Sequence, residues 1–175
     1  MSKTAVISEA EELMAFLNTW LIPNDTRQPT ETLPDLATDR DRWDKTFARV
    51  PAPVTPAERE ELLGLRDELR ADVEERGWGR LDTWLQRSPL RARVQEGHLV
   101  HRGADTPTGE VLKLAVELVA QGRWTRVRAC PDCRWVFYDQ SRNNSRVWCS
   151  MYAGETGRAC GSIAKVKEMR SRSAG

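Results

Sequence analysis

All four cysteines of the chain lie within residues 130–160, as Cys130, Cys133, Cys149 and Cys160. Thiolate sulfur is a preferred ligand of zinc, and four ligands complete a tetrahedral shell with Zn–S distances of about 2.3 Å. A Cys-x2-Cys pair supplies two sulfurs from one tight turn, which Pro131-Asp132 favours here. Because four thiolates leave no position for a reacting water, the spacing predicts one structural zinc ion per chain.

Two other uses of paired cysteines are less compatible with this sequence. Disulfides form in oxidising compartments, but Met1-Ser2-Lys3-Thr4 is not followed by the apolar segment of a signal peptide. A redox Cys-x-x-Cys works at a helix N-terminus in a thioredoxin-like context, which the residues around Cys130 do not provide. No run approaches the roughly 20 apolar residues of a membrane helix. We therefore expect a cytoplasmic protein without a membrane segment.

The residues between the cysteines indicate how the ligands are brought together. Residues 134–138 have strand propensity, residues 139–144 are rich in turn formers, and residues 146–148 can return as a second strand that delivers Cys149. Cys160 precedes a basic helix over residues 163–172. A knuckle, a hairpin and a helix with a ligand near its start describe a treble-clef-like zinc finger.

The remaining sequence reads as a mostly helical body. Hydrophobic periodicity and N-cap signals such as Ser8-Glu9-Ala10-Glu11 and Thr55-Pro56 locate most elements. The helix over residues 106–122 is predicted to bury Leu118 and Val119. The predicted elements are helices over residues 9–20, from Thr38 through Phe47, from Thr55 to Gly77, around 81–88 and over 106–122, a loop over 23–34, and a hairpin over 90–102 around Glu96-Gly97.

Charge separates the body from the finger. Residues 121–175 contain eleven Lys or Arg against four acids, a net charge of +7, whereas the first 120 residues contain 16 against 22, a net charge of −6. We therefore predict an α+β, mostly α fold in two parts. Residues 1–122 form a helical domain with a β-hairpin, and residues 123–175 form the zinc finger with its basic C-terminal helix.

At this level the sequence resembles the bacterial CGNR zinc-finger family. The resemblance lies in Cys130-Pro131-Asp132-Cys133-Arg134-Trp135-Val136-Phe137, in Asp139-Gln140-Ser141-Arg142-Asn143 and in Ser145-Arg146-Val147-Trp148-Cys149-Ser150-Met151. Family members carry an N-terminal ABATE domain, and Phe16-Leu17-Asn18-Thr19 is similar to its opening segment. The resemblance implies a stress-induced transcriptional regulator whose finger binds DNA.

Two departures from the family pattern fall near Cys160. The family motif Cys-Gly-Asn-Arg is replaced by Cys160-Gly161-Ser162-Ile163, with Lys165 still following. Ten residues separate Cys149 from Cys160 where the family has about four, an insertion that loop entropy tolerates. The metal ligands survive both departures, but the arginine of the motif is lost.

Double-stranded DNA is the partner that the charge and the resemblance favour. Basic side chains would neutralise phosphates and release counterions. Asn143 and Asn144 are expected to be turn residues rather than base readers, and Phe137 and Trp148 to be the core of the finger rather than base-stacking platforms. The candidate nucleic-acid-binding residues are Arg142, Arg146, Lys165, Lys167, Arg170 and Arg172.

Two alternatives to DNA binding remain open at the level of sequence. The finger could be a protein-interaction or scaffold module that docks on the acidic body. The body could sense a small molecule through Asn18 and the tryptophans Trp43, Trp78 and Trp84. An enzyme is not expected, because no catalytic motif is present and His98 and His101 lie on opposite sides of a predicted strand, as exposed residues. The oligomeric state is not specified by any motif.

Overall fold

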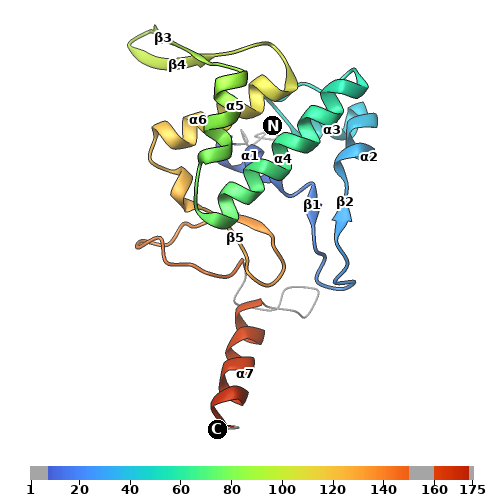
Figure 1. Cartoon of the computed structure of the whole chain (residues 1–175), viewed down its shortest axis with the longest axis vertical. Coiled ribbons are helices and arrows are strands. Elements are labelled where there is room, and N and C mark those ends of the chain that lie inside the picture. The colour runs from blue at the N-terminus through green and yellow to red at the C-terminus, as the bar shows by residue number, and fades with distance from the viewer. Residues whose placement is uncertain (1–7, 150–159, 174–175) are drawn as a thin grey trace, which may run out of the picture.

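The computed structural model describes residues 8–149 and 160–173. Within these residues, helices form the body of the molecule, and three small antiparallel sheets are attached to it (Figure 1). The elements are α1 (Glu9–Leu17), β1 (Trp20–Leu21), β2 (Thr30–Glu31), α2 (Leu33–Thr38), α3 (Arg40–Thr46), α4 (Pro56–Glu75), α5 (Gly79–Arg87), β3 (Arg91–Gln95), β4 (His98–Arg102), α6 (Pro107–Ala120), a 3-10 turn (Trp124–Arg126), β5 (Val127–Ala129), β6 (Val136–Tyr138) and α7 (Cys160–Ser173). The predicted α+β, mostly α class is confirmed.

The core lies where α1, α4, α5 and α6 pack against one another. Its fully buried side chains include Phe16, Leu65 and Leu112. Local signals set the helix starts: Ser8 and Thr55 complete capping boxes with Glu11 and Glu58, and Thr106 caps α6. Each such cap stabilises its helix by about 1 kcal/mol. Within α6 the buried face includes Leu118 as predicted, but Val119 is 45% exposed, so that prediction is wrong.

The segment after α1 differs most from the sequence-based expectation. The predicted helix over residues 9–20 ends at Leu17, and Trp20–Leu21 instead pairs with Thr30–Glu31, inside the predicted loop over residues 23–34. Thr32 donates from its amide and its hydroxyl to the carbonyl of Thr19, at 2.8 and 2.7 Å. These non-local hydrogen bonds favour an extended chain over another helical turn.

Two helix boundaries also differ. Thr38 was expected to cap a helix, but it ends α2, and Asp39 caps α3 by accepting from the amide of Arg42. At the end of α4, Arg76 adopts the left-handed conformation with φ 59°, rather than Gly77. The buried carboxylate of Asp72 then accepts from the amides of Arg80 and Leu81, which fixes the start of α5.

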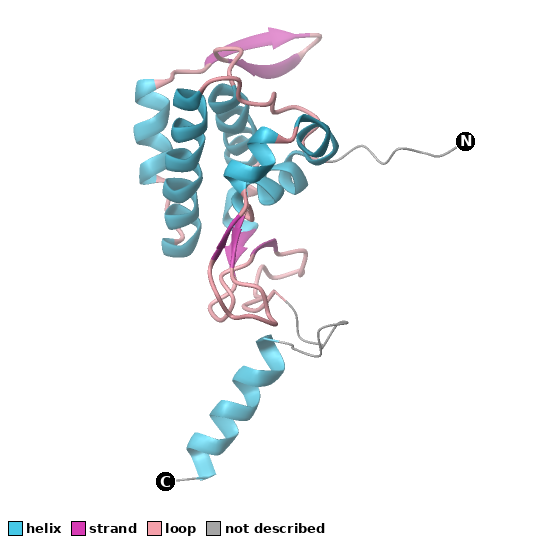
Figure 2. Cartoon of the chain, turned by 90° about the vertical axis from the view of Figure 1, so that its right-hand side faces the viewer, coloured by secondary structure: helices cyan, strands magenta, loops and turns pink. Residues whose placement is uncertain are grey.

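The finger is continuous with this body. Val127 of β5 and Val136 of β6 are buried in the same hydrophobic cluster as the helices. Figures 1 and 2 show the β5–β6 hairpin below the helices and α7 extending away from them. The division into 1–122 and 123–175 stays a prediction. Among the described residues, no helix combines the length and the hydropathy needed to cross a membrane.

Candidate metal centre

The first two cysteines occupy the turn of the β5–β6 hairpin. The amide of Cys130 donates to the carbonyl of Trp135 at 2.9 Å, and the amide of Arg134 donates to the carbonyl of Cys130 at 2.9 Å. Arg134 has φ 60°, a left-handed conformation that lets the chain reverse. This knuckle turns the side chains of Cys130 and Cys133 to one side, where both are buried.

The other two cysteines complete the cluster. The four Sγ atoms lie within 4.8 Å of one another, with 3.5 Å between Cys133 and Cys149 and 3.8 Å between Cys149 and Cys160. A zinc tetrahedron with Zn–S distances of about 2.3 Å has edges of about 3.8 Å. The four predicted ligands are therefore brought together at a spacing that can hold one zinc ion.

The chemistry of the thiols supports this reading. Cys130, Cys133 and Cys160 are buried, and Cys149 is half-buried. Hydrogen bonds from Cys133 and Cys149 lower the pKa of Cys130, whereas burial and then Asp132 raise the pKa of Cys160 to about 12. Several buried thiolates repel one another unless a cation neutralises them, and zinc supplies that charge.

The loop that carries Cys149 is held by Asp139 and Arg146. The fully buried carboxylate of Asp139 accepts from the amides of Ser141 and Arg146, each at 2.8 Å. Burial raises the pKa of Asp139, but the bonds from Ser141 and Arg146 outweigh it and keep the pKa below its ordinary value. The Arg146 guanidinium donates to the carbonyls of Trp148 and Cys149 and lies 5.0 Å from the ring of Phe137.

The expected second strand over residues 146–148 is wrong. The partner of β6 is β5, which precedes the knuckle, and residues 146–148 form no strand. The side chains of Asp139 and Arg146 hydrogen-bond to backbone groups of this loop, so these groups do not need a partner strand. The knuckle thus lies inside one hairpin, rather than ahead of one as predicted, whereas the predicted helix with Cys160 near its start is present.

Side chains of the helical body hold the hairpin from the other side. Asn18 donates from Nδ2 to the carbonyl of Val136 and accepts from its amide at Oδ1, both at 2.8 Å. Arg70 donates to the carbonyls of Leu17 and Arg134, both at 2.7 Å, and burial lowers its pKa to about 10. Arg134 in turn pairs with Glu74. Asn18, considered for a ligand pocket, is thus engaged by the finger.

The six predicted nucleic-acid-binding residues fall into two groups. Arg146 is committed to the metal loop, while Arg142 is exposed on the neighbouring turn. On α7, Arg172 pairs with Glu168 at 2.5 Å. Lys165, Lys167 and Arg170 are exposed and make no ion pair with any residue in the part of the chain that the structure describes. These three present unneutralised charge.

The aromatic and asparagine predictions can also be placed. Phe137 is buried against the cysteines and Trp148 packs beside it, as expected of a small core. Asn144 has φ 48° and hydrogen-bonds to Arg128 and Thr125, which confirms its turn role. Of the tryptophans considered for a pocket, Trp43 and Trp84 are core residues, whereas Trp78 is 59% exposed and does not share the core with them.

The geometry defines a zinc-binding module of four cysteines built on a knuckle and a helix. Comparison with known families agrees: residues 126–173 match the CGNR zinc finger. No curated protein matches the chain. The matched range begins at the 3-10 turn and leaves the helical body outside it, so the resemblance of that body to an ABATE domain stays a prediction.

Proposed function

We propose that this protein is a DNA-binding transcriptional regulator that uses its zinc finger to present α7 to duplex DNA. The observation that carries the proposal is the position of α7 and its exposed positive charge. The helix begins at the metal ligand Cys160 and projects away from the body (Figure 2). Its exposed Lys165, Lys167 and Arg170 are free to neutralise phosphates.

The zinc ion has a positioning role in this proposal. Cys160 is the first residue of α7, so coordination fixes the start of the helix relative to the knuckle. Removal of the metal would release the helix from the body without altering its charges. Zinc dependence therefore distinguishes a positioned helix from a basic segment that binds nonspecifically.

The test is a salt titration of binding to a short fluorescent duplex by the full zinc-loaded chain. Three or four phosphate contacts made by α7 predict that this helix contributes about −3 to −4 to the slope of log affinity against log salt. Lys165→Gln combined with Lys167→Gln should reduce the magnitude of the slope by about 2. The matched control is Arg40→Gln with Arg42→Gln, which removes the same charge from exposed positions of α3. Absence of binding at low salt contradicts the proposal.

A second candidate function is a zinc-stabilised scaffold for protein contacts. It is favoured by the way the knuckle is built into the body through Asn18, Arg70 and the Arg134–Glu74 pair. In that case the zinc-loaded chain would bind no duplex at any salt concentration. Chelation would abolish its binding to a protein partner. The two candidates thus differ in the outcome of the same titration.

A further inference from the structure

The β3–β4 hairpin is a second basic feature, and it lies outside the finger. Its five-residue strands pair from Arg91 opposite Arg102 to Gln95 opposite His98. All five residues of β3 are exposed. The ribbon extends beyond the helices at the end of the molecule opposite α7 (Figures 1 and 2).

The two faces of this ribbon differ in chemistry. Alternation along the strands places Arg91, Arg93 and Arg102 on one face. The other face carries Val94 and Leu99, which are 77% and 58% exposed, and His101. His101 was expected to be exposed, but its Nδ1 lies 2.8 Å from Oε1 of Glu117 on α6. The arginine face therefore points away from α6.

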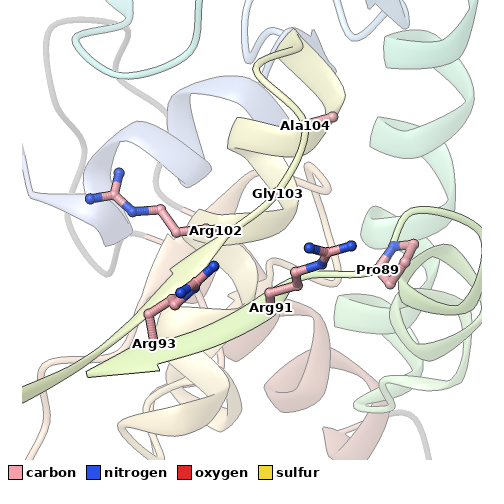
Figure 3. A pocket seen from close by; sticks show the side chains of 6 residues that line it. All are labelled: Pro89, Arg91, Arg93, Arg102, Gly103 and Ala104. Atoms are coloured by element: carbon pink, nitrogen blue, oxygen red, sulfur yellow. The ribbon is translucent and has the colours of Figure 1, made fainter. Parts of the chain in front are cut away.

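The arginines border a hollow of about 450 Å³ whose wall contains no acid. Figure 3 shows the side chains of Arg91 and Arg93 rising from β3 and that of Arg102 from β4. Arg102 hydrogen-bonds to Gln95, and within the described residues neither Arg91 nor Arg93 has an ion-pair partner. The hollow is lined by Pro89, Arg91, Arg93, Arg102, Gly103 and Ala104.

This arrangement works against the stability of the hairpin. Arg91 and Arg102 are directly opposite one another, and like charges at such positions are destabilising. A ribbon of two strands is also marginal in water by itself. A row of uncompensated arginines on an open face is instead what a ligand with several negative charges requires.

The base of the hairpin is fixed, so the arginine face has a defined position. Leu90 packs against the hydrophobic core, and His101 contacts Glu117. Cδ2 of Leu90 lies against the backbone of Gly103, where an added Cβ atom would stand 2.5 Å from it. The ribbon is held at its root while its tip stays free.

We propose that the Arg91–Arg93–Arg102 face is a second binding surface for duplex DNA, separate from α7. A two-stranded ribbon fits the major groove of B-DNA, and arginine contacts both phosphates and guanine edges. Arg91 and Arg93 are about 6.6 Å apart along the strand, a spacing that suits an extended polyanion better than one compact acid. The inference rests on DNA being the partner of the proposed function.

Because the hairpin and α7 lie at opposite ends of the molecule, each surface can be removed without touching the other. The experiment is a fluorescence titration of the full zinc-loaded chain with a short duplex over a range of salt. In a chain whose α7 surface is already weakened by Lys165→Gln and Lys167→Gln, Arg91→Gln combined with Arg93→Gln should lower the magnitude of the salt slope by about 2, and Arg102→Gln alone by about 1. Arg40→Gln with Arg42→Gln is the charge-matched control and should leave the slope unchanged.

The outcomes separate this inference from the proposed function. If the hairpin variants and the Lys165→Gln/Lys167→Gln variant each lower the slope, both surfaces bind duplex. If only the α7 variant does, the hairpin inference is overturned and the proposed function stands. If only the hairpin variants do, the hairpin binds DNA and the role of α7 is overturned. A wild-type chain that binds no duplex at low salt overturns both.

Discussion

Two antiparallel hairpins of this protein have opposite relations to the rest of the chain. In β5–β6, Val127 and Val136 belong to the hydrophobic core, the turn holds two cysteines, and Asn18 satisfies the outer edge of β6. In β3–β4, the strands are mostly exposed and arginines face one another. Isolated two-stranded ribbons are marginally stable in water, so each must be explained by what surrounds it.

The difference separates stability from binding. The β5–β6 hairpin combines burial, backbone hydrogen bonds to side chains and a metal centre, so changes there should affect folding. The arginines of the β3–β4 hairpin make no ion pair with any described residue, so changes to them should affect ligands more than folding.

The largest effect is expected from removal of the metal. Structural zinc contributes an apparent binding free energy of about 10–16 kcal/mol in small fingers. Cys133→Ala, or treatment with a chelator, should abolish stoichiometric zinc and expose the amides of residues 127–149 to hydrogen exchange. The β3–β4 hairpin and the helices α4 and α6 should exchange as before, since they contain no ligand.

Metal analysis and hydrogen exchange by mass spectrometry measure both parts of this prediction. Ser145→Ala is the control, because it changes an exposed residue of the same loop and leaves the four ligands intact. Unchanged protection of residues 127–138 after complete zinc removal would show that the helical body alone holds the β5–β6 hairpin.

An intermediate effect is expected at Asn18. Asn18→Ala leaves the amide and the carbonyl of Val136 without their partners, both in a buried position. An unsatisfied buried polar group costs about 1–3 kcal/mol, so the free energy of unfolding should fall by about 2–3 kcal/mol. Protection of β6 against hydrogen exchange should fall, and that of β3–β4 should not.

The control for Asn18 is Asn143→Ala, which removes an exposed amide and should change stability by less than about 0.5 kcal/mol. Urea denaturation of both variants gives the comparison. Equal effects of the two substitutions would remove Asn18 as the connection between the helical body and the finger.

Features set by residues close together in the sequence could be predicted, whereas features set by residues far apart could not. The cysteine spacing and the N-caps at Ser8 and Thr55 are local, and the structure confirms them. The contact of Asn18 with Val136 spans 118 residues and has no local signal. The two-residue strands β1 and β2 are too short to show a period of two, which explains why they read as helix and loop.

The finger shows the same division. Its ligands and the helix after Cys160 follow from residue type, but the strand expected at residues 146–148 does not form. The buried Asp139 supplies acceptors to the amides of Ser141 and Arg146, and Arg146 supplies donors to nearby carbonyls. Side chains thus replace the ladder that strand propensity predicts, and only the folded arrangement shows which groups they reach.

The smallest expected effect tests whether the like charges of β3–β4 lower the free energy of unfolding. Arg91→Thr removes one member of the like-charged pair with Arg102, so unfolding should require about 0.2–0.5 kcal/mol more at low salt. Arg93→Thr is the matched control, because Arg93 is opposite the uncharged Val100 in the same ribbon. High salt should abolish the difference between the two variants, since screening weakens exposed charge pairs. Urea denaturation at both salt concentrations measures it. A loss of stability on Arg91→Thr would instead show that this arginine supports the fold, as the residues of β5–β6 do.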